Sequence, residues 1–347
     1  MARDRWLGRK RNPPLTADEA GQLAMVQIIL VGLGAGAAAA LLFASIASGS
    51  VLAIVLFYLA PLPILIAGLG WSHWAGLLAG FAAAASLGLV IGLYFFIAFL
   101  IAVALPAWWL AYLSLLARPV GANGSMTLEW YPVGRLVLWA AVIAAVLVIV
   151  AVPNFGTDQE AFQAALRSAF ERAFRLQTQA PVDAPRPPLP PDTERLINIL
   201  VKALPPAAAV VATLVSVFNL WFAGRIVRLS GRLRRPWPDL STLTLPSVTP
   251  GLLAVAIAGM FLPDLAGILF GIAAASLLMA YAILGFAVLH SITRGIDYRV
   301  LALASAYAAV VVLGWPVLAV SLLGLADSAF NIRARVAKRR APPSART

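Results

Sequence analysis

The feature that most constrains the fold is a series of apolar runs of roughly the length that crosses a lipid bilayer. A membrane-spanning helix needs about 20 mostly apolar residues, and the charged share of this chain, 12% of 347 residues, is low for a soluble protein. The ten runs are Leu23–Ile46, Val51–Leu69, Trp74–Ile91, Leu93–Ala117, Val133–Val152, Ile199–Gly224, Ser247–Leu262, Ala266–Ile292, Val300–Leu313 and Val317–Ala329. We therefore predict an all-α, polytopic transmembrane helical bundle of about 8 to 10 spans.

The charge distribution predicts the topology. Twenty of the 26 Lys and Arg residues lie in the leader, in three connections and in the tail, whereas the acids of 154–202 balance the other six cations. Because cations favour the cytoplasmic side, we expect both termini to be cytoplasmic. This requires Gly314-Trp315-Pro316 to reverse the chain, as its glycine and proline favour. One long helix across this turn is the alternative reading.

These patterns divide the chain into five segments. They are a basic cytoplasmic leader (1–22), an N-terminal membrane half of five spans (23–153), an outer-face segment (154–198), a C-terminal membrane half of five spans (199–330) and a basic cytoplasmic tail (331–347). In the outer-face segment, apolar residues recur about every four positions over Asp158–Thr178, which predicts an amphipathic helix. Pro181–Pro191 is rich in proline and predicts extended chain. The segment is either a lid over an outer-facing cavity or a tether between the two halves.

Enzymatic and metal-binding motifs are missing from the sequence. There is no cysteine and there are only two histidines, which leaves few metal ligands. No Walker A, HExxH or GxSxG motif occurs. Gly32–Ala37 fits the letters of a dinucleotide fingerprint, but no acid follows about 20 residues later. We expect a protein that is not an enzyme, with no catalytic residue, resident metal or cofactor.

Polar and aromatic side chains within the apolar runs are the candidate binding residues, because polar groups are costly at membrane depth. Gln27 lies early in the first run, and Asn219 lies near the inner end of the sixth. Trp108 and Trp109 follow Pro106 in the fourth run, where they form either a ligand-stacking wall or ordinary packing. These four residues are the predicted substrate-binding set.

A second set is predicted to be structural. Asp327 is expected to pair with Arg333 or Arg294 and so fix the C-terminal hairpin, with substrate or proton binding as the alternative. His290 is either an interfacial hydrogen-bonding residue or a pH-sensitive one. Gly32 and Gly36 begin a row of small residues that lets another helix approach closely.

The basic run Arg225–Arg235 predicts contacts with anionic lipids or with a cytoplasmic partner. A nucleic acid is not an expected partner for so short a loop against the membrane.

Two C-terminal motifs carry a family resemblance. Leu289-His290-Ser291-Ile292-Thr293-Arg294-Gly295 and Leu323–Arg333 resemble the closing pattern of the YybS-like family, bacterial integral membrane proteins with domain of unknown function 2232. The small-residue first run and Pro61 and Pro63 of the second run fit the amino-terminal half of that family.

The YybS-like family is in turn similar to the substrate-binding S components of energy-coupling-factor vitamin transporters. This resemblance implies a vitamin or metal-ion substrate near the outer face. It also implies that small residues of the first helix, either Ala35 with Ala39 or Gly32 with Gly36, contact a membrane coupling subunit driven by separate ATPases.

The sequence therefore favours a small-solute-binding or transport component that works in the lipid bilayer with a separate energising partner. The alternative is a non-transporting scaffold or regulator whose basic loops recruit partners or anionic lipids. Arginine outnumbers lysine 23 to 3, as is typical of GC-rich genomes. The bacterial cytoplasmic (inner) membrane is the expected location of this multi-pass chain.

Overall fold

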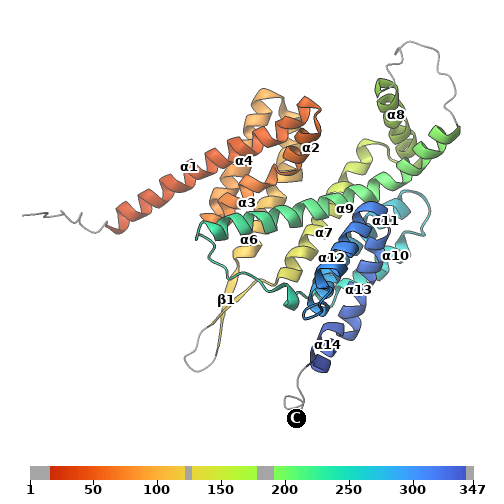
Figure 1. Cartoon of the computed structure of the whole chain (residues 1–347). Helices are drawn as coiled ribbons and strands as arrows, with labels where there is room; N and C mark the ends of the chain where they lie inside the picture. The colour runs from red at the N-terminus through yellow and green to blue at the C-terminus, as the bar shows by residue number, and fades with distance from the viewer. Residues whose placement is uncertain (1–15, 122–126, 178–190, 341–347) are drawn as a thin grey trace, which may run out of the picture.

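A computed structural model describes residues 16–121, 127–177 and 191–340. These residues are almost entirely helical and form two bundles that share one long helix (Figure 1). The N-terminal bundle holds α1 to α6, and the C-terminal bundle holds α7, α8 and α10 to α14. The predicted all-α class is confirmed.

The N-terminal bundle contains α1 (Ala17–Ala44), α2 (Val51–Tyr58), α3 (Pro61–Gly70), α4 (His73–Val90), α5 (Leu93–Phe99) and α6 (Leu105–Leu115). Thr16 and Glu19 form a capping box that begins α1. A π-helical turn, Leu100–Ala104, joins α5 to α6. Pro106 explains this turn, because it cannot donate the helical hydrogen bond to the carbonyl of Ala102.

A short antiparallel hairpin of β1 (Ala117–Val120) and β2 (Thr127–Trp130) connects the two bundles. Its exposed Arg118 and Glu129 face each other across the strands and form an ion pair of 2.7 Å. The hairpin extends away from the helices at the end of the molecule where α6 ends and α7 begins.

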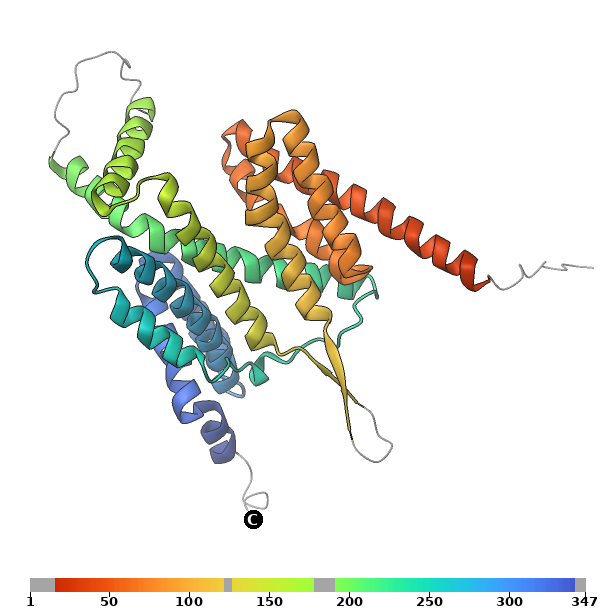
Figure 2. The same ribbon diagram turned by 180° about the vertical axis from the view of Figure 1, so that it is seen from behind.

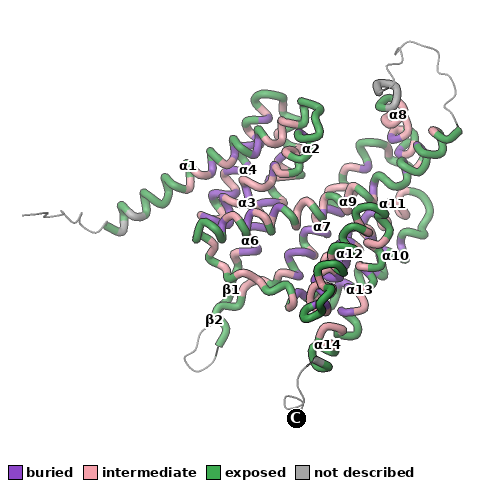
Figure 3. The backbone as a smooth tube through the Cα atoms, in the orientation of Figure 1, coloured by how far each residue is buried: buried purple, intermediate pink, exposed green. Residues whose placement is uncertain are grey.

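The C-terminal bundle contains α7 (Val133–Ala151), α8 (Gln159–Gln177), α10 (Thr249–Gly259), α11 (Asp264–Ile292), α12 (Arg299–Leu313), α13 (Pro316–Phe330) and α14 (Ile332–Arg340). The shared helix is α9 (Pro191–Leu229), which has 39 residues and packs against α3 of one bundle and against α7 and α11 of the other. The view from behind shows α9 crossing both bundles (Figure 2). Buried residues line α9 and α11, whereas the N-terminal part of α1 and most of α12 are exposed (Figure 3).

The described residues contain seven or eight helices that could span a membrane, at the lower end of the predicted 8 to 10. Seven described helices are long and apolar enough to cross a membrane, and the bent pair α13–α14 gives an eighth if it is counted as one span. All ten predicted runs contain helix, but α10 has 11 residues and α12 has 15. Both are short because prolines and glycines interrupt the chain at their ends, at Pro246, Pro263, Gly295 and Gly314. The apolar runs predicted the helices well, and they overestimated the number that can span.

Candidate functional site

The largest described cavity that we identify lies between the two bundles and has a volume of about 740 Å³. Residues of α2, α3, α5, α6 and the π-helical turn between them form one wall, and residues of α7, α8 and α9 form the other. Almost every lining side chain is apolar, and Tyr58 and Ser216 are the two with hydroxyl groups. A cavity of this size and character suits a small ligand.

The cavity follows α9 from Leu204 to Ser216. At 1.5 Å of rise per residue this stretch is about 18 Å long, which is a little more than half of the roughly 30 Å hydrocarbon core. Ala208 and Ala212 face this space, and their small side chains leave it open. The cavity is therefore long enough to take an apolar chain of about this length.

Two prolines interrupt the hydrogen bonding of α9 at the end of the cavity nearest α8. Pro205 and Pro206 lie inside the helix, and Pro205 lines the cavity. Because proline has no N–H group, the carbonyl groups of Val201 and Lys202 lack their usual helical donors. Backbone acceptors at membrane depth need another partner, and these two carbonyl groups belong to residues next to the cavity lining.

Helix α8 closes the same end of the cavity. The Asp158 carboxylate accepts a hydrogen bond of 2.8 Å from the Ala161 N–H group and so caps the start of the helix. Phe162 and Leu166 line the cavity and are 3% and 4% exposed, respectively. They pack with Ile197 and Val201 of α9 in one apolar cluster.

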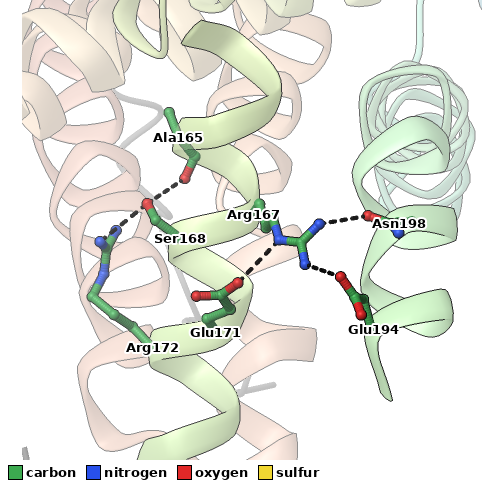
Figure 4. Close-up of polar contacts among 7 residues, drawn as sticks. All are labelled: Ala165, Arg167, Ser168, Glu171, Arg172, Glu194 and Asn198. Atoms are coloured by element: carbon green, nitrogen blue, oxygen red, sulfur yellow. Dashed lines mark hydrogen bonds and ion pairs between the residues drawn. The ribbon is translucent and has the colours of Figure 1, made fainter. Parts of the chain in front are cut away.

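Arg167 ties α8 to the first turns of α9 (Figure 4). Its guanidinium donates to the carboxylate of Glu194 over 2.8 Å, to the amide oxygen of Asn198 over 3.0 Å and to Glu171 over 3.1 Å. The hydrogen bonds to Glu194 and then to Glu171 raise the pKa of Arg167 above its ordinary value. The sequence showed the amphipathic helix but did not show that Arg167 bridges to residues 27 and 31 positions later.

The four predicted substrate-binding residues do not come together, and none of them lines the main cavity. Gln27 is exposed on α1. Trp108 and Trp109 are half-buried beside Tyr112, and Trp109 also meets Trp139 edge-on at 5.6 Å. The two tryptophans therefore pack against other rings instead of facing the cavity.

Asn219 is buried and contributes to the wall of the cavity indirectly. Its amide group donates to the carbonyl oxygens of Tyr58 and Val215, both over 2.9 Å. Tyr58 and Val215 themselves line the cavity. Asn219 thus ties α9 to the break between α2 and α3, and this contact explains an amide at membrane depth.

Gly32 and Gly36 are buried against α4, so the prediction that they contact a separate subunit does not agree with the structure. A Cβ atom on Gly36 would lie 2.7 Å from the carbonyl oxygen of Ala79 and 2.8 Å from Cβ of Ala82. The row of small residues does let a helix approach closely. That helix is α4 of the same chain.

At the end of the molecule away from α8, Asp327 and Arg333 form the predicted ion pair, which joins α13 to α14. The two charged groups are 2.8 Å apart, and their side chains are only 4% and 12% exposed. Arg333 also donates to the carbonyl oxygens of Ser241 and Leu243, each over 2.7 Å. Arg294 pairs instead with Asp239, at 3.4 Å.

These residues surround a second hollow of about 540 Å³, which is lined by Ser241, Ser291, Arg294, Asp327, Asn331 and Arg333 among others. His290 lies nearby on α11, is half-buried and shares a hydrogen bond of 2.9 Å with the carbonyl of Phe286.

The basic run Arg225–Arg235 packs against aromatic rings of the same chain. Arg232 lies over Trp71 at 4.4 Å, and Arg228 lies over Trp237 at 5.1 Å. Arg235 donates to the Ser114 carbonyl over 3.4 Å. These contacts connect the segment after α9 with α6 and the α3–α4 turn. Within the described ranges, no group of three or more His, Asp or Glu side chains could hold a metal ion.

The fold and its apolar cavity define a polytopic α-helical membrane protein. Residues 37–328 match the profile of the family described as predicted membrane protein (DUF2232), and the chain belongs to this family. No curated protein and no solved structure matches the chain.

Proposed function

We propose that the protein binds an apolar or amphiphilic small molecule within the bilayer, in the cavity between its two bundles. The observation that carries this proposal is the cavity itself, whose walls come from both bundles and from α9. Its apolar lining favours a hydrocarbon chain or ring system over a charged solute, because a charge moved into such a site would be left without a partner.

The polar groups of the site favour an amphiphile. The carbonyl groups that Pro205 and Pro206 leave without helical donors lie next to the lining at the α8 end, and Arg167 lies on α8 itself, outside the lining. The hydroxyl groups of Tyr58 and Ser216 are the other polar groups of the lining. A ligand with a hydrogen-bond donor at one end and an apolar body would match this arrangement.

Transport of the ligand driven by ATP would need a separate energising partner, because the sequence has no motif for ATP hydrolysis. Such a partner would contact a surface other than Gly32 and Gly36, which α4 covers. The alternative role as a scaffold has less support, since Arg228, Arg232 and Arg235 contact rings and a carbonyl of the chain itself. The bacterial cytoplasmic membrane is the location that we propose for this activity.

Filling the cavity tests the proposal. We would titrate the full chain in lipid nanodiscs with a polyene fatty acid, whose fluorescence rises in apolar surroundings. The substitutions Ala208→Phe and Ala212→Phe together should fill the cavity and weaken saturable binding by at least about tenfold, because each adds a ring to a lining position. Ala203→Phe on the same helix is the matched control, since Ala203 is exposed and does not line the cavity.

Saturable binding that is lost in the double variant and kept in the control would support the proposal. Equal binding to all three proteins, or a signal that rises without saturation in each, would mean that the fatty acid dissolves in the lipid and would refute it. Native mass spectrometry of the same samples would identify any molecule that the wild-type cavity retains and the filled cavity loses.

A further inference from the structure

Helix α14 carries a one-sided row of positive charge. Its sequence, Ile332–Arg340, contains no acidic residue. Arg335, Lys338 and Arg339 are exposed. Lys338 lies three residues after Arg335, which places these two side chains on one face of the helix. Ile332 and Val336 are partly buried on the side of the helix next to this face. The side chains of Arg335 and Lys338 therefore lie on the solvent-accessible side of α14.

The direction of α14 is fixed by the contacts at its start. The chain turns by 75° between α13 and α14, and Asn331 makes this turn in the left-handed region with a φ of 51°. The Asp327 carboxylate accepts hydrogen bonds of 2.9 Å from the backbone N–H of Arg333 and from its Nε. The remaining Arg333 donors reach the segment before α10. These contacts fix the start of α14 and so keep its exposed cations at the surface of the protein.

The start of α14 lies at the level where two membrane helices end. It begins two residues after apolar α13 ends, and it contacts α11. The hollow beside it is lined by Ser291 and Ile292, the last residues of α11, a helix of 29 residues that is long enough to span. A spanning helix leaves the hydrocarbon core at the headgroups, so an α11 that crosses the bilayer brings the start of α14 to headgroup depth.

We propose that the exposed face of α14 that carries Arg335 and Lys338 binds the headgroups of anionic phospholipids in the leaflet where α11 and α13 end. Opposite charge provides the attraction, and the turn at Asn331 lays the helix across the direction of α13 instead of continuing it into solvent. This site differs from the sequence-based expectation, which placed anionic lipids at Arg225–Arg235. In the structure, Arg228 and Arg232 of that run stack on Trp237 and Trp71.

The test compares lipid binding by charge-matched variants of the full chain. Native mass spectrometry would measure the dissociation constants of added phosphatidylglycerol and phosphatidylcholine. Arg335→Gln with Lys338→Gln removes two charges from the row and should weaken phosphatidylglycerol binding by about 30-fold, at roughly fivefold for each charge. Phosphatidylcholine binding should stay the same. Arg335→Lys with Lys338→Arg keeps both charges and should bind as the wild type does.

The decisive control is Arg118→Gln with Arg135→Gln. It removes the same charge from the β-hairpin and the start of α7, at the same end of the molecule. Unchanged binding in this control, together with loss in the α14 variant, supports the proposal. An equal loss of phosphatidylglycerol affinity in both variants would show that the lipid responds to the total positive charge at this end of the protein. Unchanged affinity in the α14 variant would show that the lipid binds elsewhere. Either result would overturn the proposal. So would an acidic peptide that binds to α14 while phosphatidylglycerol shows no preference for it.

Discussion

Asp327→Asn should loosen the junction of α13 and α14 more than any nearby exposed substitution. The change removes the negative charge from an ion pair whose two side chains are 4% and 12% exposed. Breaking a buried pair by removing one partner costs about 3–5 kcal/mol, because the remaining charge is left without compensation. Arg333 keeps its bonds to the Ser241 and Leu243 carbonyls, so we expect the lower end, about 3 kcal/mol.

Hydrogen exchange measured by mass spectrometry would detect this loss. If the amides of α14 exchange through local opening, a loss of about 3 kcal/mol makes them exchange more than 100-fold faster, since each 1.36 kcal/mol is a factor of ten. The amides of α4 should be unaffected, because α4 packs in the other bundle. Exchange of α14 that is unchanged in Asp327→Asn would refute the idea that the pair holds this helix.

A double variant separates the pair from its surroundings. Asp327→Leu with Arg333→Met removes both charges, and replacing a buried pair by apolar residues is often nearly neutral. The Ser241 and Leu243 carbonyls would lose their donors, which adds a cost of about 1–3 kcal/mol for each group left buried. We therefore expect the double variant to lose less stability than the two single changes together. Additive losses would contradict a direct coupling between Asp327 and Arg333.

Two further predictions concern other contacts. Gly36→Leu should destabilise the packing of α1 on α4 and lower the thermal stability of the detergent-solubilised protein, because its Cβ would lie 2.7 Å from the Ala79 oxygen. Gly34→Leu should be tolerated, since nothing lies within 4 Å of its Cβ. Arg167→Gln should speed proteolysis within α8 by several-fold at most, because an exposed ion pair contributes about 0–1 kcal/mol. Arg172→Gln, which loses one hydrogen bond to Ser168 within α8, should change proteolysis less, and equal effects would argue against the link to α9.

The helices of this protein could be predicted from local patterns. The run that begins at Leu93 became one broken helix, and the amphipathic pattern over Asp158–Thr178 became α8 within a residue at each end. The partner of Asp327 could also be predicted, because Arg333 is only six positions away. In each case the physical cause, either apolar periodicity or a costly charge with a close partner, lies within one short stretch of sequence.

The cavity could not be predicted in this way. Its walls join Tyr58 with Val215, and Phe162 with Leu204, and no local pattern specifies such distant pairs. The reasoning from polar groups in apolar runs selected Gln27 and Asn219, yet the main cavity is lined by small and apolar residues such as Ala208 and Ala212. A small residue, glycine or alanine, inside a membrane helix can serve either close helix packing or open space. Gly36 has the first and Ala212 the second, and only the tertiary arrangement distinguishes them.

Whether α8 is a lid or a tether depends on what holds it in place. Its ion pair with α9 is about one-third exposed at Arg167, so water and salt screen it and it contributes about 1 kcal/mol or less. Phe162 and Leu166 are almost fully buried, and burying two such side chains contributes about 3–6 kcal/mol. Apolar contact with α9 and the cavity wall therefore contributes more than the ion pair to holding α8 in its position. Phe162 and Leu166 of α8 cover apolar surface of the cavity that a ligand would also contact. A ligand that binds there would replace part of this contact, so ligand entry would be coupled to movement of α8.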